Sequence, residues 1–186
     1  MPTTLEHIDR ELFLTLNGLH NAFWDPVMYW ASNKYIWIPM YAILLYLVYR
    51  NYKWKSLLIL AGAAVLIAIT DQAVLHLFKN MFERLRPCHD PGIGDMVHLV
   101  NDRCGGKYGF VSAHAANTFA LAAFLNGWLK PRYRYFYIFI FGWAAFVSYS
   151  RIYLGVHYPG DVLGGAILGL AAGYLIYRLM RWKVIG

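Results

Sequence analysis

Seven polar residues whose chemistry could serve a reaction lie at the edges of long apolar stretches. They are Lys79, Arg86, Ser112, His114, Arg151, His157 and Asp161. Ionisable residues beside such stretches are costly, so each is a functional candidate. Together they supply three cations, a hydroxyl, two imidazoles and a carboxylate. This set suits the binding of an anionic group and its attack by a histidine.

The cations and one expected helix start predict a phosphate-binding site. Arg86 and Arg151 offer forked N–H donors that match phosphate oxygens, and Lys79 adds a third positive charge. Ser112 stands where the N-cap of an apolar helix is expected. The free N–H groups and the positive dipole end of that helix would then face the same anion.

Two histidines and one aspartate predict the reacting groups. His157 and Asp161 are four residues apart, with Pro159 and Gly160 between them. A turn should therefore end there and place Asp161 in the first turn of the next helix. From that position the carboxylate can orient one ring nitrogen of His157 and leave the other as the nucleophile. His114 is then the general acid for the leaving oxygen, and the reaction needs no metal or other cofactor.

A simpler interpretation exists for each residue alone. Lysine and arginine side chains near helix ends reach toward the interface between lipid and water. Ser112 and Asp161 can act as helix caps. The functional interpretation depends on all seven residues lying on one surface, and the topology predicted from the charges places them there.

Five long apolar stretches must position these residues. Hydrophobic residues make up 59% of the 186 residues and charged residues only 15%, with a mean hydropathy of +0.40. A bilayer span needs about 20 apolar residues, so we interpret the stretches as transmembrane helices of one all-α integral membrane bundle covering residues 1–186. Their ranges are 27–49, 57–78, 113–129, 135–150 and 162–180.

The distribution of Lys and Arg predicts the topology. Segments 50–56, 130–134 and 178–183 hold nine basic and no acidic residues, while the rest of the chain holds eight basic and all ten acidic residues. Basic loops face the cytoplasm, so the net charge of +7 reflects topology and predicts no nucleic-acid partner. The same assignment puts the loop 79–112 and the turn 151–161 outside, with all seven polar residues on that surface.

The N-terminal segment 4–20 is expected to form an amphipathic helix. Its apolar residues recur at spacings of three and four, namely Leu5, Ile8, Leu12, Leu16 and Leu19. Such a helix can lie in the outer interface of the membrane. Packing against the bundle as a buried strut is the alternative.

Residues inside the apolar stretches predict how the helices pack. Gly165, Gly169 and Gly173 recur every fourth residue, and such small residues let helices approach closely in lipid. The stripe could serve packing within the chain or, as an alternative, a homodimer. Asp71 and His76 are interpreted as hydrogen-bond partners inside the bundle rather than as catalytic groups.

The two cysteines, Cys88 and Cys104, both fall in the predicted outer loop. An oxidising compartment favours a disulfide between them. Closing the loop could contribute about 3 kcal/mol to stability and hold Arg86 in position. A zinc site with His89 and His98, or two free thiols, are the alternatives.

Three motifs resemble those of the type 2 phosphatidic acid phosphatase family, which shares them with vanadium haloperoxidases. The first, Lys, six residues and Arg-Pro, is here KNMFERLRP at 79–87. The second, usually Pro-Ser-Gly-His, is VSAH at 111–114. The third, Ser-Arg, five residues, His, three residues and Asp, is SRIYLGVHYPGD at 150–161. The resemblance extends over residues 71–173.

The resemblance implies a role for each motif residue. His157 would attack phosphorus and form a phosphohistidine, His114 would protonate the leaving group, and Asp161 would support His157. The phosphate would be held by Lys79, Arg86, Ser112, Arg151 and the main-chain N–H of Ala113. Ala113 replaces the usual glycine and Val111 the usual proline, so a methyl group slightly crowds the phosphate and the entry turn is less rigid.

The sequence therefore predicts a lipid phosphatase of the bacterial inner membrane, with its site facing the periplasm or cell exterior. By resemblance alone, the preferred substrate is an isoprenoid (undecaprenyl) diphosphate. Lipid A, phosphatidylglycerol phosphate and phosphatidic acid are the alternatives. A lipid phosphotransferase, a vanadate haloperoxidase and a non-catalytic membrane protein are rival functions, and five spans argue against the haloperoxidase.

Overall fold

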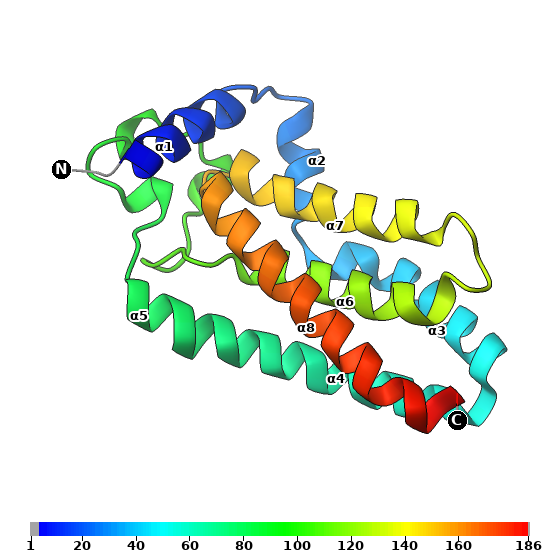
Figure 1. Ribbon diagram of the computed structural model, residues 1–186. Helices are drawn as coiled ribbons and strands as arrows, with labels where there is room; N and C mark the ends of the chain where they lie inside the picture. The colour runs from blue at the N-terminus through cyan, green and yellow to red at the C-terminus, as the bar shows by residue number, and fades with distance from the viewer. Residues whose placement is uncertain (1–3, 186) are drawn as a thin grey trace.

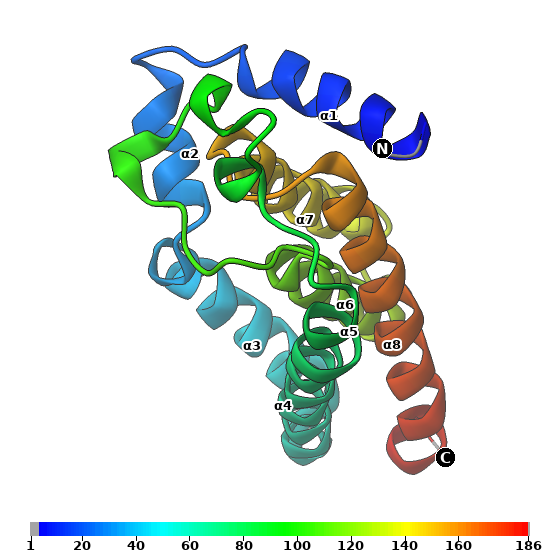
Figure 2. The ribbon, with the colours of Figure 1, turned by 90° about the vertical axis from the view of Figure 1, so that its left-hand side faces the viewer.

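A computed structural model describes residues 4–185 as a helical bundle (Figure 1). Within this range the only β-type pairing is one isolated bridge. Figures 1 and 2 show α1 lying across one end of the bundle, beside the long loop that follows α5. The helices are α1 (Thr4–Asn17), α2 (Trp24–Ala31), α3 (Ile38–Tyr52), α4 (Ser56–Gln72), α5 (Asn80–Phe82), α6 (Ala113–Leu129), α7 (Phe136–Tyr153) and α8 (Pro159–Ile185).

Helix α6 occupies the centre of the bundle and packs against α4, α7 and α8. Its alanines let α8 approach closely, since a Cβ added at Gly165 would lie 3.1 Å from the Cβ of Ala115 and one at Gly173 would lie 3.0 Å from that of Ala123. The glycine stripe is therefore used for packing within the chain.

The first predicted span, 27–49, is wrong as a continuous helix. α2 ends at Ala31, a 3-10 turn covers Lys34–Trp37, and α3 follows. The break lies at Asn33, which has an extended backbone and whose side chain accepts a hydrogen bond from Tyr35 N at 3.0 Å. An asparagine side chain that bonds to the main chain competes with the helical hydrogen bonds.

The second span, 57–78, continues further than predicted. α4 passes into a π-helical segment, Ala73–Lys79, and ends with α5 at Phe82, where Glu83 adopts a left-handed conformation. π-Helical turns often occur at functional sites, and this one contains Lys79. The outer loop thus begins at Glu83 rather than Lys79. His76 is exposed on an outer groove, not inside the bundle.

The last three helices lie close to their predicted ranges. α6 has the predicted bounds, while α7 extends three residues beyond 150 and α8 extends beyond 162–180 at both ends. Arg151 therefore belongs to the last turn of α7. Pro159 opens α8, since its fixed φ suits the first turn of a helix.

Exposed apolar side chains indicate that lipid surrounds the bundle. Segments Lys34–Phe82 and Pro159–Val184 are long and apolar enough to cross a membrane, and the mean hydropathies of their most apolar 18-residue windows are 2.1 and 1.6. Only 28% and 22% of their most apolar windows are buried inside the chain. A core helix of a soluble protein would be mostly buried, so these faces suit lipid.

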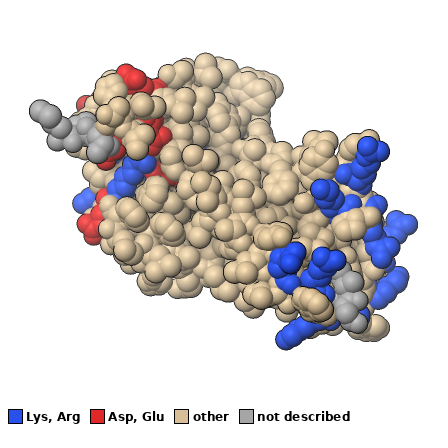
Figure 3. Space-filling model, in the orientation of Figure 1, with Lys and Arg blue, Asp and Glu red and all other residues tan. Residues whose placement is uncertain are grey.

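The charges separate along the bundle. On the face shown in Figure 3, Lys and Arg gather at the end that carries the C-terminus, and Asp and Glu gather at the end with α1. This separation agrees with the three basic segments found in the sequence. The long loop and α1 belong to the acidic end.

Helix α1 packs against the bundle with one face and leaves an apolar face exposed. Phe13 and Asn17 face inward, and Asn17 donates to Tyr153 O at 2.8 Å. Most of the predicted apolar stripe faces outward, with Leu5 78% and Ile8 55% exposed, whereas Leu16 packs against the buried cluster around Phe13. The helix thus ties the outer end of the bundle together while presenting an apolar face suited to a membrane interface.

Candidate active site

A short extended segment after α5 positions two arginines. An antiparallel bridge at Leu85 pairs the segment with residues 107–109, and main-chain hydrogen bonds of 2.8 and 3.1 Å flank it. Successive side chains of an extended segment alternate in direction. Arg84 and Arg86 therefore lie on the same side, and the carboxylate of Asp161 acts electrostatically on both.

His157 and Asp161 form a buried pair at the start of α8. His157 Nδ1 lies 3.4 Å from Asp161 Oδ2, and the two residues are 2% and 0% exposed. Burial, followed by the positive charge of Arg86 and neighbouring cations, lowers the pKa of His157 well below its usual value. The imidazole is therefore neutral near pH 7, as a nucleophile requires.

Both oxygens of Asp161 are held by further donors. Oδ1 accepts from Arg84 Nη1 at 2.9 Å, and Oδ2 accepts from Tyr158 N at 3.0 Å. Arg84 Nη2 also donates to Asp9 at 2.7 Å, and Asp9 accepts from Gly160 N at 2.8 Å. Burial opposes the charge of Arg84, but the carboxylates of Asp161 and Asp9 outweigh it and raise the pKa of Arg84. The network fixes the direction in which Asp161 faces His157.

The start of α6 is joined to the start of α8. Ser112 N donates to Asp161 O at 2.9 Å. Ser112 holds the predicted N-cap position, but its side chain makes no capping bond, and its buried Oγ has no partner among the described residues. The hydroxyl and the first N–H groups of the helix, including that of Ala113, are thus available to an anion.

Three cations, Lys79, Arg86 and Arg151, act electrostatically on the His157 ring, and none of them forms an ion pair with a carboxylate of the described residues. Arg86 and Arg151 both act electrostatically on Lys79. Arg151 Nε is buried with no partner in the described part of the chain, and Nη1 donates to Ser32 Oγ. Burial lowers the pKa of Arg86, and the Asp161 charge opposes this without cancelling it. A bound dianion would balance the excess positive charge.

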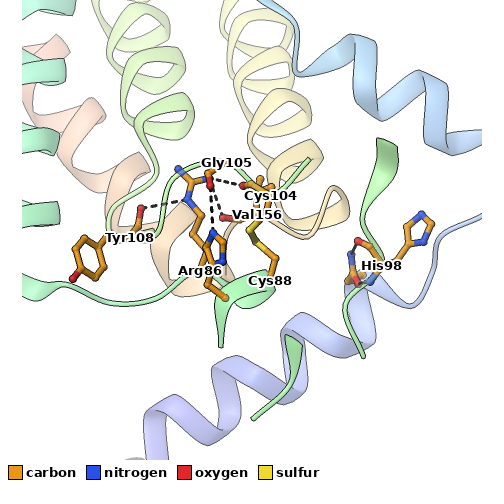
Figure 4. Close-up of a disulfide and its surroundings, with 9 residues drawn as sticks. Arg86, Cys88, His98, Cys104, Gly105, Tyr108 and Val156 are labelled. Carbon is orange, nitrogen blue, oxygen red and sulfur yellow. Dashed lines mark hydrogen bonds between the residues drawn. A yellow bond between two sulfur atoms is a disulfide. The ribbon is translucent and has the colours of Figure 1, made fainter. Parts of the chain in front are cut away.

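Arg86 is braced by carbonyls from two parts of the chain (Figure 4). Its Nε donates to Tyr108 O at 3.3 Å, and Nη1 lies 3.4 Å from Val156 O and 3.5 Å from Cys104 O. Cys104 forms the predicted disulfide with Cys88, sixteen residues earlier in the chain. The disulfide therefore secures one of the carbonyls that orient Arg86.

The zinc alternative does not fit this arrangement. Cys88, His89 and Cys104 are the one described group of His, Cys and acidic side chains close enough to share a metal ion. Their sulfurs are bonded to each other, so they offer no thiolates. His98, the other predicted ligand, lies 3.1 Å from Asp25 instead.

Several residues of the site were not recognised from the sequence. Arg84 had no assigned role, and Asp9 lies 75 residues before it, so no spacing signal joins them. A Cβ added at Gly109 would lie 2.9 Å from Asp161 Oδ2, so the glycine makes room for the carboxylate. Long-range ion pairs and close approaches of this kind depend on the tertiary fold.

Ser32 also belongs to the site. Besides its side chain accepting from Arg151, Ser32 places its main chain close enough to the His114 ring to influence it electrostatically. The helix break that follows α2 is what brings Ser32 there. In a continuous helix the Ser32 carbonyl would accept a hydrogen bond from the residue four positions later, so it would not be free to face His114.

The geometry places a neutral, oriented imidazole beside a group of cations that can bind an anion. His157 and Asp161 come from the α8 start, Ser112 and His114 from the α6 start, and the cations from α7, the π-helical turn and the loop. All the residues predicted from the three motifs thus converge on one end of the bundle. The arrangement can bind a phosphate group, attack it and protonate a leaving oxygen.

Comparisons with known proteins agree with this chemistry. A model of the PAP2 superfamily matches residues 57–185. A protein named lipid A 4'-phosphatase from Bacteroides thetaiotaomicron is 45% identical over 93% of this chain and 77% of its own length. One of the same name from Porphyromonas gingivalis is 37% identical over 92% of this chain and 72% of its own. An undecaprenyl-diphosphatase from Sulfolobus acidocaldarius is 27% identical over 91% of this chain and 77% of its own.

A solved structure shares the whole architecture. The transmembrane PAP2-type phosphatidylglycerolphosphate phosphatase from Bacillus subtilis superposes with a TM-score of 0.72. The match covers 98% of this chain and 89% of that one at 23% identity. The fold is therefore that of an all-α membrane bundle. Motifs, fold and relatives lead to one conclusion: the chain belongs to the PAP2 superfamily and is a hydrolase of phosphoric esters.

Proposed function

We propose that this protein is a membrane phosphatase that hydrolyses a phosphate monoester of lipid A and releases inorganic phosphate. The observation that carries the proposal is the 45% identity, over 93% of the chain, to a protein named lipid A 4'-phosphatase. The relative named for undecaprenyl diphosphate matches at 27%. Similarity therefore favours lipid A over the isoprenoid diphosphate preferred from the sequence motifs, which becomes the second candidate.

The reaction proceeds in two displacements at phosphorus. Nδ1 of His157 faces Asp161, so Nε2 attacks, the N–P bond forms, and the bond from phosphorus to the lipid oxygen breaks. His114 gives its proton to that oxygen. Water then attacks the phosphohistidine and gives a proton to His114, the N–P bond breaks, and inorganic phosphate leaves.

Charge stabilisation comes from groups already in place. Lys79, Arg86 and Arg151 face the three non-bridging oxygens together with the hydroxyl of Ser112. The N–H of Ala113 adds a donor at the positive end of α6. Preorganised donors of this kind stabilise the transition state without further rearrangement.

In the membrane, the acidic end of the bundle faces the periplasm and the basic end faces the cytoplasm. The separation of charges in Figure 3 supports this orientation, since basic loops stay in the cytoplasm. The proposed location is the bacterial inner membrane, with five crossings made by α2–α3, α4–α5, α6, α7 and α8. Lipid A phosphate on the outer leaflet would then reach the site.

The test is phosphate release in detergent with EDTA present. Lipid A, undecaprenyl diphosphate and phosphatidic acid are compared for the wild type and His157→Ala. We expect the wild type to release phosphate fastest from lipid A and the variant to release none. Preference for undecaprenyl diphosphate would support the second candidate, and equal rates for wild type and variant would contradict a histidine phosphatase.

A further inference from the structure

A cavity of about 600 Å³ lies on the His114 side of the site, between α3, α4, α6 and α7. Along α6 it extends from His114 to Leu121, a distance of about 10 Å at 1.5 Å per residue. Trp143 of α7 lines the cavity as well. The antiparallel course of α6 and α7 places Trp143 near the end farther from His114.

The chemistry of the site determines what this cavity would hold. In an in-line displacement the leaving oxygen lies opposite the attacking nitrogen of His157. The acid that protonates it, His114, lines the cavity. A smaller cavity of about 350 Å³ is lined by Arg86, Arg103 and Arg151 and suits phosphate and water. The leaving group therefore belongs in the larger cavity.

The end of the cavity next to His114 is polar. Asp71 and Asn117 both line it, and Asn117 Nδ2 donates to Asp71 Oδ1 at 2.7 Å. Asn117 Oδ1 in turn accepts from Thr70 at 2.6 Å. Among the described residues Asn117 alone hydrogen-bonds to Asp71, whose second oxygen stays available. A carboxylate exposed within a membrane-spanning helix is costly unless it has a function.

The far end of the cavity is aromatic with one unused donor. Trp143 packs edge-on against Trp37 and Tyr41, with ring centroids 5.9 and 6.1 Å apart. Trp143 is 6% exposed, yet its Nε1–H has no hydrogen-bond partner in the described part of the chain. A buried donor without a partner is unfavourable, so a ligand acceptor would satisfy it.

We infer that this cavity binds the acylated amino-sugar ring that carries the scissile phosphate. Asp71 accepts a hydrogen bond from a hydroxyl or amide N–H of the ring, and Trp143 donates to a carbonyl of an attached acyl chain. The aromatic walls contact the ring face and the chain. The leaving group of an isoprenoid diphosphate is an anionic isoprenoid phosphate, which offers Asp71 no donor and is repelled by its carboxylate, so the cavity favours an acylated sugar. This inference rests on the proposed function.

The test compares two phosphate monoesters in the same mixed micelles, lipid A and dodecyl phosphate, whose leaving group has no hydroxyl or carbonyl besides the oxygen released from phosphorus. Selectivity is the kcat/KM for lipid A divided by the kcat/KM for dodecyl phosphate. We expect Asp71→Asn to lower the ratio about 10- to 100-fold, as for loss of a hydrogen bond to a charged group. Gln72→Ala, at an exposed position on the outer groove of the same helix, should keep the wild-type ratio.

Trp143→Phe provides a second variant should Asp71→Asn fail to fold, because it keeps an aromatic ring at this position and removes the N–H together with part of the indole. It should lower the ratio about tenfold. Wild-type selectivity in a folded Trp143→Phe or Asp71→Asn protein would overturn the cavity assignment alone. A wild type that cleaves dodecyl phosphate but not lipid A would instead overturn the proposed function and with it this inference.

Discussion

Replacement of Arg84 by glutamine should remove the ion pair that holds the Asp161 carboxylate in position. Arg84 bridges two carboxylates, Asp161 at 2.9 Å and Asp9 at 2.7 Å, and its side chain is 24% exposed. A glutamine can bond to one of them at most and carries no charge. Among the described residues, the Asp161 carboxylate would keep only Tyr158 N and the His157 ring as partners.

The expected magnitude follows from this burial. Removing one partner of a buried ion pair costs about 3–5 kcal/mol. For a chain of this size that corresponds to a fall in melting temperature of about 10 °C. A loosely held Asp161 also misorients His157, and a displacement of about 1 Å costs roughly 100-fold in rate. We therefore expect kcat to fall about 10- to 100-fold while KM changes little, since the phosphate-binding cations remain.

The assay measures melting in detergent and lipid phosphatase kinetics below the melting temperature. Lys107→Gln is the matched control, because Lys107 is an exposed cation of the same loop that lies over the Tyr108 ring at 5.5 Å. Arg84→Lys, which keeps the charge, should recover part of both losses. Wild-type melting and kcat in Arg84→Gln would refute the role assigned to the bridge.

Three further predictions concern other parts of the site. Gly109→Ala places a Cβ 2.9 Å from Asp161 Oδ2 and should lower kcat about tenfold; unchanged kcat would contradict the close approach. The pKa of His157 is lower in the folded than in the unfolded protein, so acid favours unfolding. Stability should fall as the pH drops below about 6.5, and a melting series should show a smaller fall for His157→Gln. Cys88→Ser breaks the disulfide that secures a carbonyl on Arg86, so KM should rise and melting occur at lower temperature; wild-type values would contradict the brace.

Motif spacing identified seven polar residues that the structure places at one end of the bundle, although not every residue around them. His157 and Asp161 could be paired because a proline and a glycine between them mark the start of a helix. Ser112 could be placed because a long apolar stretch begins directly after it. These signals are local, and the charge distribution predicted that they share one end of the bundle.

The parts that escaped prediction depend on tertiary structure. The helix break at Asn33 interrupts an otherwise continuous apolar stretch, where hydrophobicity alone favours one span. Asp9 and Arg84 meet only because α1 folds back over the end of the bundle. The proposed selectivity for lipid A depends on cavity side chains such as Asp71, interpreted from the sequence as structural, and the cavity is formed between four helices.

In the proposed mechanism His157 carries the phosphate during turnover. Lipid A labelled with ³²P is mixed with the wild type and with His157→Ala, quenched in base within one turnover, and the protein is separated from the lipid. We predict transient label on the wild-type protein that is stable in base and released in acid, as for a phosphohistidine, and none on the variant. Phosphate release from lipid A by His157→Ala at the wild-type rate would contradict the role of His157 as the nucleophile.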